Sequence, residues 1–140
     1  MALNLKFLFD NNLSPHLAAG MAEFSKTDVR VAQVVHLRSR FAANTPDEIW
    51  LPALATEGGW SIISCDQFKK TTAERELVRR HGLCVFVLDK QWAGKPFWEM
   101  SANFVTWWPT ILGVAELTSK AAYRVPYKRQ GQKTLEQIRA

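Results

Sequence analysis

The sequence of 140 residues is poor in cysteine, with only Cys65 and Cys84. Each cysteine stands in a strand-like apolar segment, so we expect both to be small core residues rather than groups with a chemical role. None of the three histidines has a spacing to these cysteines that is typical of zinc ligands. The histidines are His16, His36 and His81.

Long hydrophobic runs are also missing. No stretch of the sequence approaches the roughly 18 apolar residues that a membrane span needs. The first apolar run is short and ends at Asp10, which is unlike a secretory signal. We therefore expect a soluble, cytoplasmic protein, and its 47% apolar content is ordinary for a globular chain.

An excess of one charge is absent from most of the chain. Residues 1–119 carry 12 Lys and Arg against 12 Asp and Glu, whereas residues 120–140 carry six basic residues against Glu136 alone. We expect one domain over residues 1–127, followed by a basic C-terminal arm over residues 128–140. Such arms bind nucleic acid or acidic partners; the alternative is a solvated tail that aids solubility.

Apolar segments and helical patterns alternate along the first two thirds of the sequence. This order predicts a parallel sheet with right-handed crossovers, in an α/β fold of three layers whose four- to five-stranded, mainly parallel sheet is flanked by helices. The expected strands are residues 4–9, 29–37, 60–65 and 83–88, and the expected helices are residues 13–24, 45–56 and 72–81.

The following region has a different pattern. Residues 96–116 place apolar side chains at helical spacing, and Pro109 is expected to kink this helix or split it in two. Residues 123–127 are expected to form an edge strand, because an edge position tolerates Pro126.

Three acidic residues follow or separate the strand-like runs. Asp10 follows the first run, Asp66 follows the third, and Glu48 stands in the first turn of the helix between them. The carboxyl ends of parallel strands share one edge of the sheet, and ligands bind there. Carboxylates that converge at such an edge repel one another unless a cation lies among them, and Mg²⁺ or Mn²⁺ prefers such oxygen ligands. The pattern therefore predicts a metal site that acts on a phosphate-rich substrate.

Each acid also has a purely structural interpretation. Thr45 at the N-cap, Pro46 at the first helical position and Glu48 form a capping-box pattern, so Glu48 is alternatively a cap residue. Asp47 is an alternative ligand, or a favourable charge at the helix N-terminus. Asp10 and Asp66 are alternatively turn or N-cap residues. Two further acids, Glu74 and Asp89, are weaker candidates for the same edge.

Polar and basic residues near the acids are candidates for contact with nucleic acid. The amides of Asn11 and Asn12 are placed to hold a water or a phosphate oxygen, or simply to form a turn. Basic side chains follow Asp66 and recur in the arm, where they contact a phosphate backbone or form a solvated face. They are Lys69, Lys70, Arg75, Arg79, Lys128 and Arg129. The tryptophans at 98, 107 and 108 are expected to pack in the core or at a dimer interface rather than to stack on bases.

Several motifs of the sequence are similar to those of a known family. The stretch at residues 9–15, Phe-Asp-Asn-Asn-Leu-Ser-Pro, resembles the opening of PIN-like domains, in which an acid ends the first strand. The resemblance covers most of the chain and is closest to the VapC-type toxins of bacterial type II toxin–antitoxin systems. It continues through residues 36–38, 45–51, 62–66, 73–75, 82–88 and 107–109.

This resemblance implies a three-layer PIN-like domain with Mg²⁺-dependent ribonuclease activity, dimeric in many members and inhibited by a cognate antitoxin protein. It implies that Asp10, Glu48 and Asp66 bind the metal. Many members have a fourth acid one or two positions after the third, whereas Gln67 and Phe68 stand there in this chain. Either Glu74 or Asp89 replaces that acid, or only one metal ion binds well.

Three functions are compatible with these observations. The first is an RNA-cleaving enzyme with a carboxylate-bound metal. The second is a non-catalytic module of the same fold that binds RNA or a protein partner. The third is a phospho-acceptor receiver-like domain, which would need a pair of acids after the first strand, where Asn11 and Asn12 stand.

Overall fold

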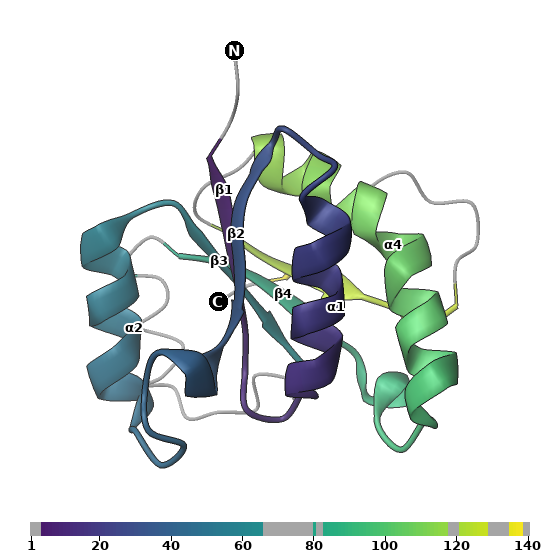
Figure 1. The fold of residues 1–140 in the computed structure, drawn as a ribbon, viewed down its shortest axis with the longest axis horizontal. Helices are drawn as coiled ribbons and strands as arrows, with labels where there is room; N and C mark the ends of the chain where they lie inside the picture. Colours follow the sequence, from purple (N-terminus) through teal and green to yellow (C-terminus); the bar gives the residue numbers. More distant parts are fainter. Residues whose placement is uncertain (1–3, 66–79, 81–82, 118–120, 129–134, 139–140) are drawn as a thin grey trace.

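The fold is an α/β domain built on a six-stranded, mostly parallel sheet (Figure 1). The computed structural model describes residues 4–65, 80, 83–117, 121–128 and 135–138. The strand order is β2-β1-β3-β4-β5-β6, and only β6 runs antiparallel to its neighbour. The strands are β1 (Leu5–Phe9), β2 (Val31–His36), β3 (Trp60–Ser64), β4 (Cys84–Leu88), β5 (Ala122–Val125) and β6 (Glu136–Ile138).

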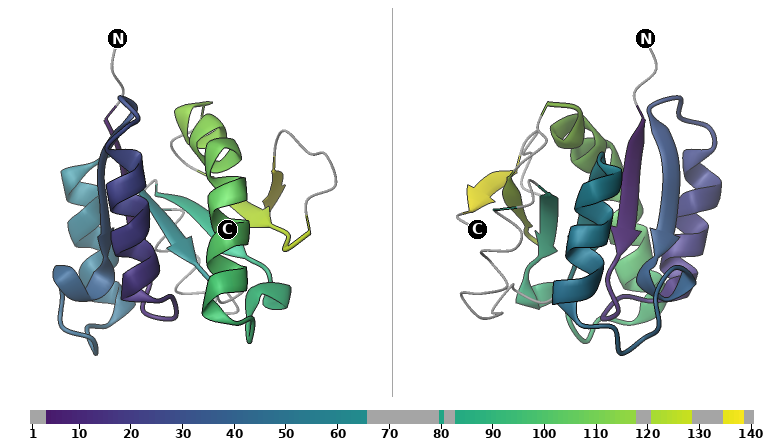
Figure 2. Two further views of the ribbon diagram at one scale, coloured as in Figure 1. Left: turned by 45° about the vertical axis from the view of Figure 1, so that its right-hand side comes forward. Right: turned by 90° about the vertical axis from the view of Figure 1, so that its left-hand side faces the viewer.

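Helices cover both faces of the sheet and give the predicted three layers. The helices are α1 (Pro15–Ser25), α2 (Asp47–Glu57) and α4 (Phe97–Leu117), with short 3₁₀ turns η1 (Leu37–Ser39) and η2 (Lys90–Trp92). Figure 2 shows α2 on one side of the sheet and α1 and α4 on the other. Within the described part of the chain, no helix is both long and apolar enough to span a bilayer.

The alternation of side chains along the strands divides the core into two halves. Phe7 and Phe9 of β1 face α1 and α4, whereas Leu8 between them faces α2. On the α4 side, the ring of Phe9 lies 5.4 Å from Phe104, and Phe7 lies 4.7 Å from Trp108. Each such aromatic pair adds about 0.5–1.5 kcal/mol beyond its buried area. The packing of aromatic rings therefore fixes α4 against the strands that carry the candidate site.

The two helices that begin near the site start differently. Ser14 caps α1, because its hydroxyl accepts hydrogen bonds from the N–H groups of His16 and Leu17 at 3.0 and 3.4 Å. The predicted N-cap at Thr45 is wrong: Pro46 occupies the N-cap of α2, and no side chain caps that helix. Pro46 has extended backbone angles (φ −65°, ψ 151°), which shifts the helix start to Asp47.

In the last third of the chain, one expectation holds in part and another is corrected. Of the two outcomes expected at Pro109, the helix is not split; α4 stays a single helix that bends in its second half (Figure 1). The strand predicted over residues 123–127 ends at Val125, before Pro126, and is not an edge strand, because β6 pairs with its outer side. This sixth strand, formed by residues of the predicted basic arm, explains why the sheet exceeds the four to five strands expected.

The other predicted strands and helices agree with the structure to within about two residues wherever it is described. The predicted helix at residues 72–81 lies outside the described residues, apart from Arg80, which is helical.

Candidate active site

The candidate site lies at the edge of the sheet where the parallel strands end. β1, β3 and β4 are adjacent and parallel, so their carboxyl ends lie side by side. Asp10 follows β1, Ser64 ends β3 and Asp89 follows β4. Figure 1 shows that α1 and α2 also begin at this lower edge, which brings their first turns to the same end of the molecule.

Asp10 is buried at this edge, with 7% of its surface exposed. Its backbone N–H donates to the carbonyl of Ile63 at 2.9 Å, which continues the β1–β3 ladder by one residue. Its Oδ1 accepts a hydrogen bond from the N–H of Asn11 at 2.7 Å, and its Oδ2 accepts one from the Ser64 hydroxyl at 3.3 Å. Neutral donors from two chain segments thus orient a carboxylate that the sequence predicts as a metal ligand.

The two asparagines after Asp10 connect three segments of the site. The Oδ1 of Asn12 accepts a hydrogen bond from the N–H of Cys65 at 3.2 Å, which fixes the exit of β3. The Nδ2 of Asn11 donates to the carbonyl of Ala43 at 2.8 Å, in the loop before α2. The Oδ1 of Asn11 accepts a hydrogen bond from Nε of Arg38 at 3.3 Å. Both amides therefore connect the turn after β1 to distant segments, and their predicted contact with a water or a phosphate oxygen stays a prediction.

A buried histidine holds the end of β2 to the same turn. Nδ1 of His36 accepts the N–H of Arg38 at 3.1 Å, so the ring proton lies on Nε2, which donates to the carbonyl of Leu13 at 2.8 Å. This tautomer joins β2 to the start of α1. It also places Arg38 at the mouth of the site, beside Asn11.

The acids of α2 differ in their partners. The Oδ1 of Asp47 accepts a hydrogen bond from the indole Nε1 of the buried Trp50 at 3.0 Å, which anchors Asp47 to its own helix. Glu48 is solvent-exposed in the first turn, and because α2 has no side-chain cap, the capping-box role considered for Glu48 is wrong. The contact between Asn11 and Ala43 joins the start of this helix to the turn that contains Asp10.

The third predicted ligand lies outside the described residues. Asp66 is two positions beyond Ser64, whose hydroxyl bonds to Asp10. The predicted residues Glu74, Lys69, Lys70, Arg75, Arg79 and Arg129 also lie outside the described part of the chain.

The remaining predicted residues are visible. Asp89 caps η2, since its Oδ1 accepts the N–H of Gln91 at 3.0 Å, and it lies after β4, next to β3. Lys128 is exposed just beyond β5. Asp89 therefore has a capping role of its own at the shared edge of the sheet.

The donor set can be tested for its fit to a metal. Among residues 4–65, 80, 83–117, 121–128 and 135–138, no group of three His, Cys, Asp or Glu side chains is arranged to hold an ion. The predicted set includes Asp66, which these ranges do not contain. The oxygen donors of Asp10 and Glu48 are of the type that Mg²⁺ and Mn²⁺ prefer, and nitrogen or sulfur donors are not part of the set.

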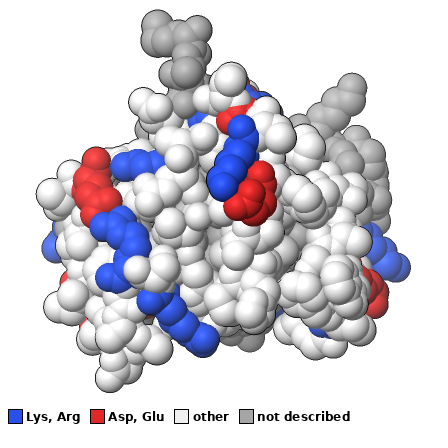
Figure 3. Space-filling model, in the orientation of Figure 1, with Lys and Arg blue, Asp and Glu red and all other residues white. Residues whose placement is uncertain are grey.

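Basic side chains border this face. Figure 3 shows a band of Lys and Arg side chains on the α2 side of this face, with acidic side chains at its upper end, and a second group of adjoining basic and acidic side chains near the top. Arg40 is one of the paired residues: it bonds to Glu57 and lies over the Trp60 ring, with its guanidinium carbon 5.3 Å from the ring centroid. The hydrogen bonds from Arg40 and Trp60 lower the pKa of Glu57 to about 2.

The cysteines and tryptophans are mostly core residues. Cys84 is buried, and its burial raises the pKa of its thiol to about 11, which confirms the predicted packing role. Trp107 and Trp108 are buried, as predicted. Trp98 is 82% exposed, so it does not pack in the core, and its expected place at a dimer interface stays a prediction. Cys65 is half-buried at the end of β3.

Sequence reasoning missed Ser64, His36 and Arg38 as parts of this site. The available signal was their position. Ser64 ends β3, His36 ends β2 and Arg38 follows it, and both strands are neighbours of β1. Their partners depend on the strand register, in which Phe9 lies opposite both Ile63 and His36.

Comparison with known proteins identifies a family. A family model described as a PIN like domain matches residues 5–90, which is more than half of the chain. The match spans β1 to the start of η2 and includes the turn after β1 and the start of α2. No curated protein and no solved structure matches the chain.

Proposed function

The chain belongs to the PIN-like domain family, and on that premise we propose that it is a metal-dependent endoribonuclease that cleaves phosphodiester bonds of RNA. One observation supports this proposal above the others: the buried carboxylate of Asp10 lies at the carboxyl edge of the sheet, hydrogen-bonded to the end of β3. An aspartate whose only task is to stabilise a turn is not expected to be buried at the edge where α/β sheets bind ligands.

In this proposal Asp10, Glu48 and Asp66 hold Mg²⁺ or Mn²⁺. The bound ion would neutralise charge on the scissile phosphate and lower the pKa of a water molecule. Ser64 and the N–H of Asn11 orient the carboxylate of Asp10. Glu48, the second ligand of this proposal, is exposed in the first turn of α2. Arg38, at the mouth of the site, contacts the phosphate backbone.

The biological role that we propose is that of the toxin in a toxin–antitoxin pair, with a cognate antitoxin and a homodimeric state. The resemblance of the motifs around Asp10, Glu48 and Asp66 to VapC-type toxins supports this role. A neighbouring gene that encodes a small DNA-binding protein is the expected accompaniment, and co-expression of its product should suppress cleavage.

A cleavage assay tests the enzymatic proposal. Purified protein is incubated with mixed cellular RNA in the presence of Mg²⁺, of Mn²⁺, or of EDTA. We expect discrete RNA fragments with either metal, none with EDTA, and recovery of cleavage when metal is restored. Cleavage that persists at full rate in EDTA would exclude a metal-dependent mechanism.

The alternative function is a non-catalytic module that binds RNA or a protein partner. It is favoured by Gln67 and Phe68, which stand where many family members have a fourth acid. Calorimetric titration with Mn²⁺ near neutral pH distinguishes the two functions. Saturable binding supports the enzyme, whereas RNA binding without any metal binding supports the module.

A further inference from the structure

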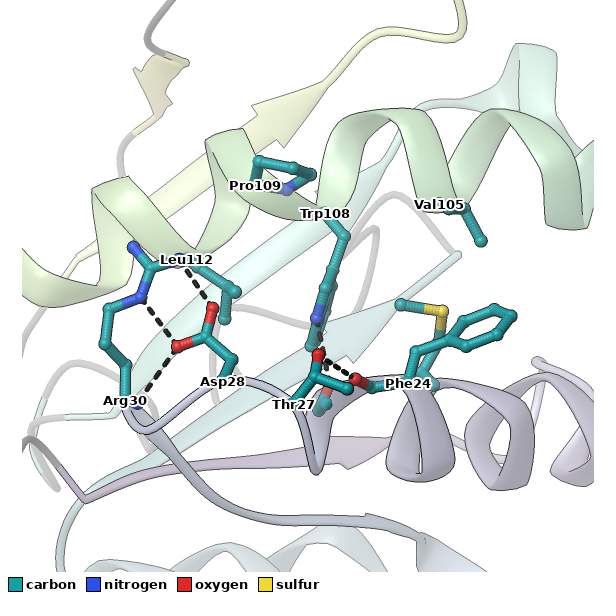
Figure 4. A pocket seen from close by; sticks show the side chains of 10 residues that line it. Phe24, Thr27, Asp28, Arg30, Val105, Trp108, Pro109 and Leu112 are labelled. Atoms are coloured by element: carbon teal, nitrogen blue, oxygen red, sulfur yellow. Dashed lines mark hydrogen bonds and ion pairs between the residues drawn. The ribbon is translucent and has the colours of Figure 1, made fainter.

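A second cavity lies away from the candidate active site, between α1 and α4. It has a volume of about 290 Å³ and opens on the surface between the two helices (Figure 4). One wall is formed by the C-terminal end of α1 and the turn that leads into β2. This turn lies at the edge of the sheet where the parallel strands begin. The cleft and the acidic edge at Asp10 therefore lie at opposite ends of the strands.

One end of this cleft is apolar. Phe24 of α1 and Val105 of α4 form its rim, and they are 59% and 40% exposed. Met21 lies behind them, and the indole of Trp108 lies at the centre of the cleft (Figure 4). Covering such an exposed phenylalanine with an apolar group is favourable, because it removes apolar surface from water.

The polar atoms around Trp108 are already bonded within the protein. The indole Nε1 donates to the hydroxyl of Ser25 at 3.0 Å, and the hydroxyl of Thr27 donates to the carbonyl of Phe24 at 2.7 Å. The middle of the cleft therefore offers an aromatic face more than it offers hydrogen bonds. Discrimination among ligands has to come from the other end.

That other end carries a surplus of negative charge. Arg30 donates to Asp28 through Nε at 3.0 Å and through Nη2 at 2.7 Å, and to Glu116 through Nη1. One guanidinium thus faces two carboxylates, which leaves a formal charge of −1 on the three groups. The hydrogen bonds from Arg30 also lower the pKa of Asp28 to about 2, so Asp28 is ionised at neutral pH. These bonds use three of the five N–H donors of Arg30, so the guanidinium is already largely committed to the two carboxylates.

From this arrangement we propose that the α1–α4 cleft binds an organic ammonium ion with an apolar or aromatic body. The body lies against Trp108 between Phe24 and Val105, and the ammonium group approaches the carboxylate of Asp28, which lines the cleft. Glu116 is not part of the lining and acts through its charge, beside Arg30 to which it bonds. The cleft combines an apolar wall with one polar end, which is the usual composition of a small-molecule site. This site is independent of the ribonuclease proposal and would exist in a catalytically inactive protein.

Three probes with the same phenylethyl body test the proposal: 2-phenylethylamine, 2-phenylethanol and 3-phenylpropanoate, which are cationic, neutral and anionic at pH 7. Each is titrated into the ¹⁵N-labelled full chain, and the indole N–H resonance of Trp108 is followed. We expect the amine to bind best and the carboxylate worst. At low salt, the affinity should fall about two- to fivefold from the amine to the alcohol, and again from the alcohol to the carboxylate, which is the range of a partly exposed ion pair. Both differences in affinity should shrink as salt is added.

Two variants separate charge from packing. Glu116→Gln should abolish the preference for the amine over the alcohol, because Asp28 and Arg30 then balance. Glu99→Gln, a matched change on the same helix at a residue that bonds to Tyr127, should leave the preference unchanged. Equal shifts from all three probes, no saturable shift from the amine, or an amine preference that survives Glu116→Gln would overturn the proposal.

Discussion

Two aspartates at opposite ends of the parallel sheet use their carboxylates differently. Asp28 precedes β2, is partly exposed and accepts hydrogen bonds from the backbone and the guanidinium of Arg30. Asp10 follows β1, is buried and accepts hydrogen bonds from the N–H of Asn11 and the hydroxyl of Ser64. A guanidinium neutralises a carboxylate, whereas a backbone amide and a hydroxyl orient one. Asp28 therefore stabilises the turn before β2, whereas our proposal for Asp10 rests on its burial at the edge where α/β sheets bind ligands.

The largest expected effect comes from the aspartate at the carboxyl end. Asp10→Asn keeps the shape of the side chain and removes the charge, so RNA cleavage should fall by more than about 100-fold. Substitution of a residue that only supports a metal ligand typically costs about 10- to 100-fold in activity. The matched variant Asp28→Asn should retain cleavage. Initial rates on a labelled RNA measure both, and thermal unfolding checks that both variants fold. Cleavage by Asp10→Asn at the wild-type rate would remove Asp10 from the mechanism.

The serine that orients Asp10 should have the next largest effect. Ser64→Ala removes the hydroxyl that donates to Oδ2, and cleavage should fall about 10-fold, as for other residues that orient metal ligands. Raising the Mn²⁺ concentration should restore part of the rate, which a merely structural loss would not allow. Ser61→Ala, at the other end of the same strand, is the control and should leave both the rate and its Mn²⁺ dependence unchanged.

The arginines provide a smaller contrast. Arg38 donates to the neutral Asn11, whereas Arg40 bonds to Glu57. Arg38→Gln should weaken RNA binding and reduce the slope of log K against log [salt] by about 1, the signature of one lost phosphate contact. Arg40→Gln should leave this slope unchanged. Fluorescence anisotropy with a labelled RNA in EDTA measures both slopes, and equal slopes for wild type and Arg38→Gln would place the RNA elsewhere.

The smallest effect belongs to the aspartate at the amino end. The pKa of Asp28 falls from its ordinary value of 3.8 to about 2 through its hydrogen bonds with Arg30. A lowered pKa stabilises the fold above the ordinary value, and this contribution is lost as pH falls from about 4 toward 2. Asp28→Asn should cost roughly 0.5–1 kcal/mol at pH 7.

Urea unfolding between pH 2 and pH 6 measures this dependence. The difference in stability between wild type and Asp28→Asn should narrow as the pH falls below about 4. Glu57, whose pKa is also lowered to about 2, contributes to the acid sensitivity of both proteins and cancels in this comparison. A gap that stays constant over the whole range would show that the loss has a cause other than the ion pair.

Much of the fold is predictable from the sequence because its signals are local. The apolar runs that end at Asp10 and after Ser64 give β1 and β3, and Ser14 with Pro15 gives the start of α1. The start of α2 was misplaced because the extended backbone of Pro46 takes the N-cap, although Thr45 has the better side chain for that position. The sequence predicts β5 at the edge of the sheet, whereas β6 lies outside it. No local pattern in the sequence indicates this pairing with a later segment.

The candidate site is predictable only in outline. Parallel strands bring Asp10 and the end of β3 together, and this follows from the order of elements. The bond from Asn11 to Ala43 and the tautomer of His36 depend on the path of loops and on strand register, which periodicity does not encode. The sequence likewise does not show how Asp10 and Asp28 differ. Arg30 stands two positions after Asp28, but its bond to Asp28 is seen only in the structure.

Paramagnetic broadening by Mn²⁺ tests the central claim most directly, because it reports where the ion binds without requiring catalysis. Substoichiometric Mn²⁺ is added to the ¹⁵N-labelled full chain, and the amide resonances are followed. The account predicts that the amides of Asp10, Asn11, Ser64 and Glu48 broaden first, and that Asp10→Asn abolishes this pattern. First broadening at Asp28 and Glu116, or at no discrete group of residues, would contradict it.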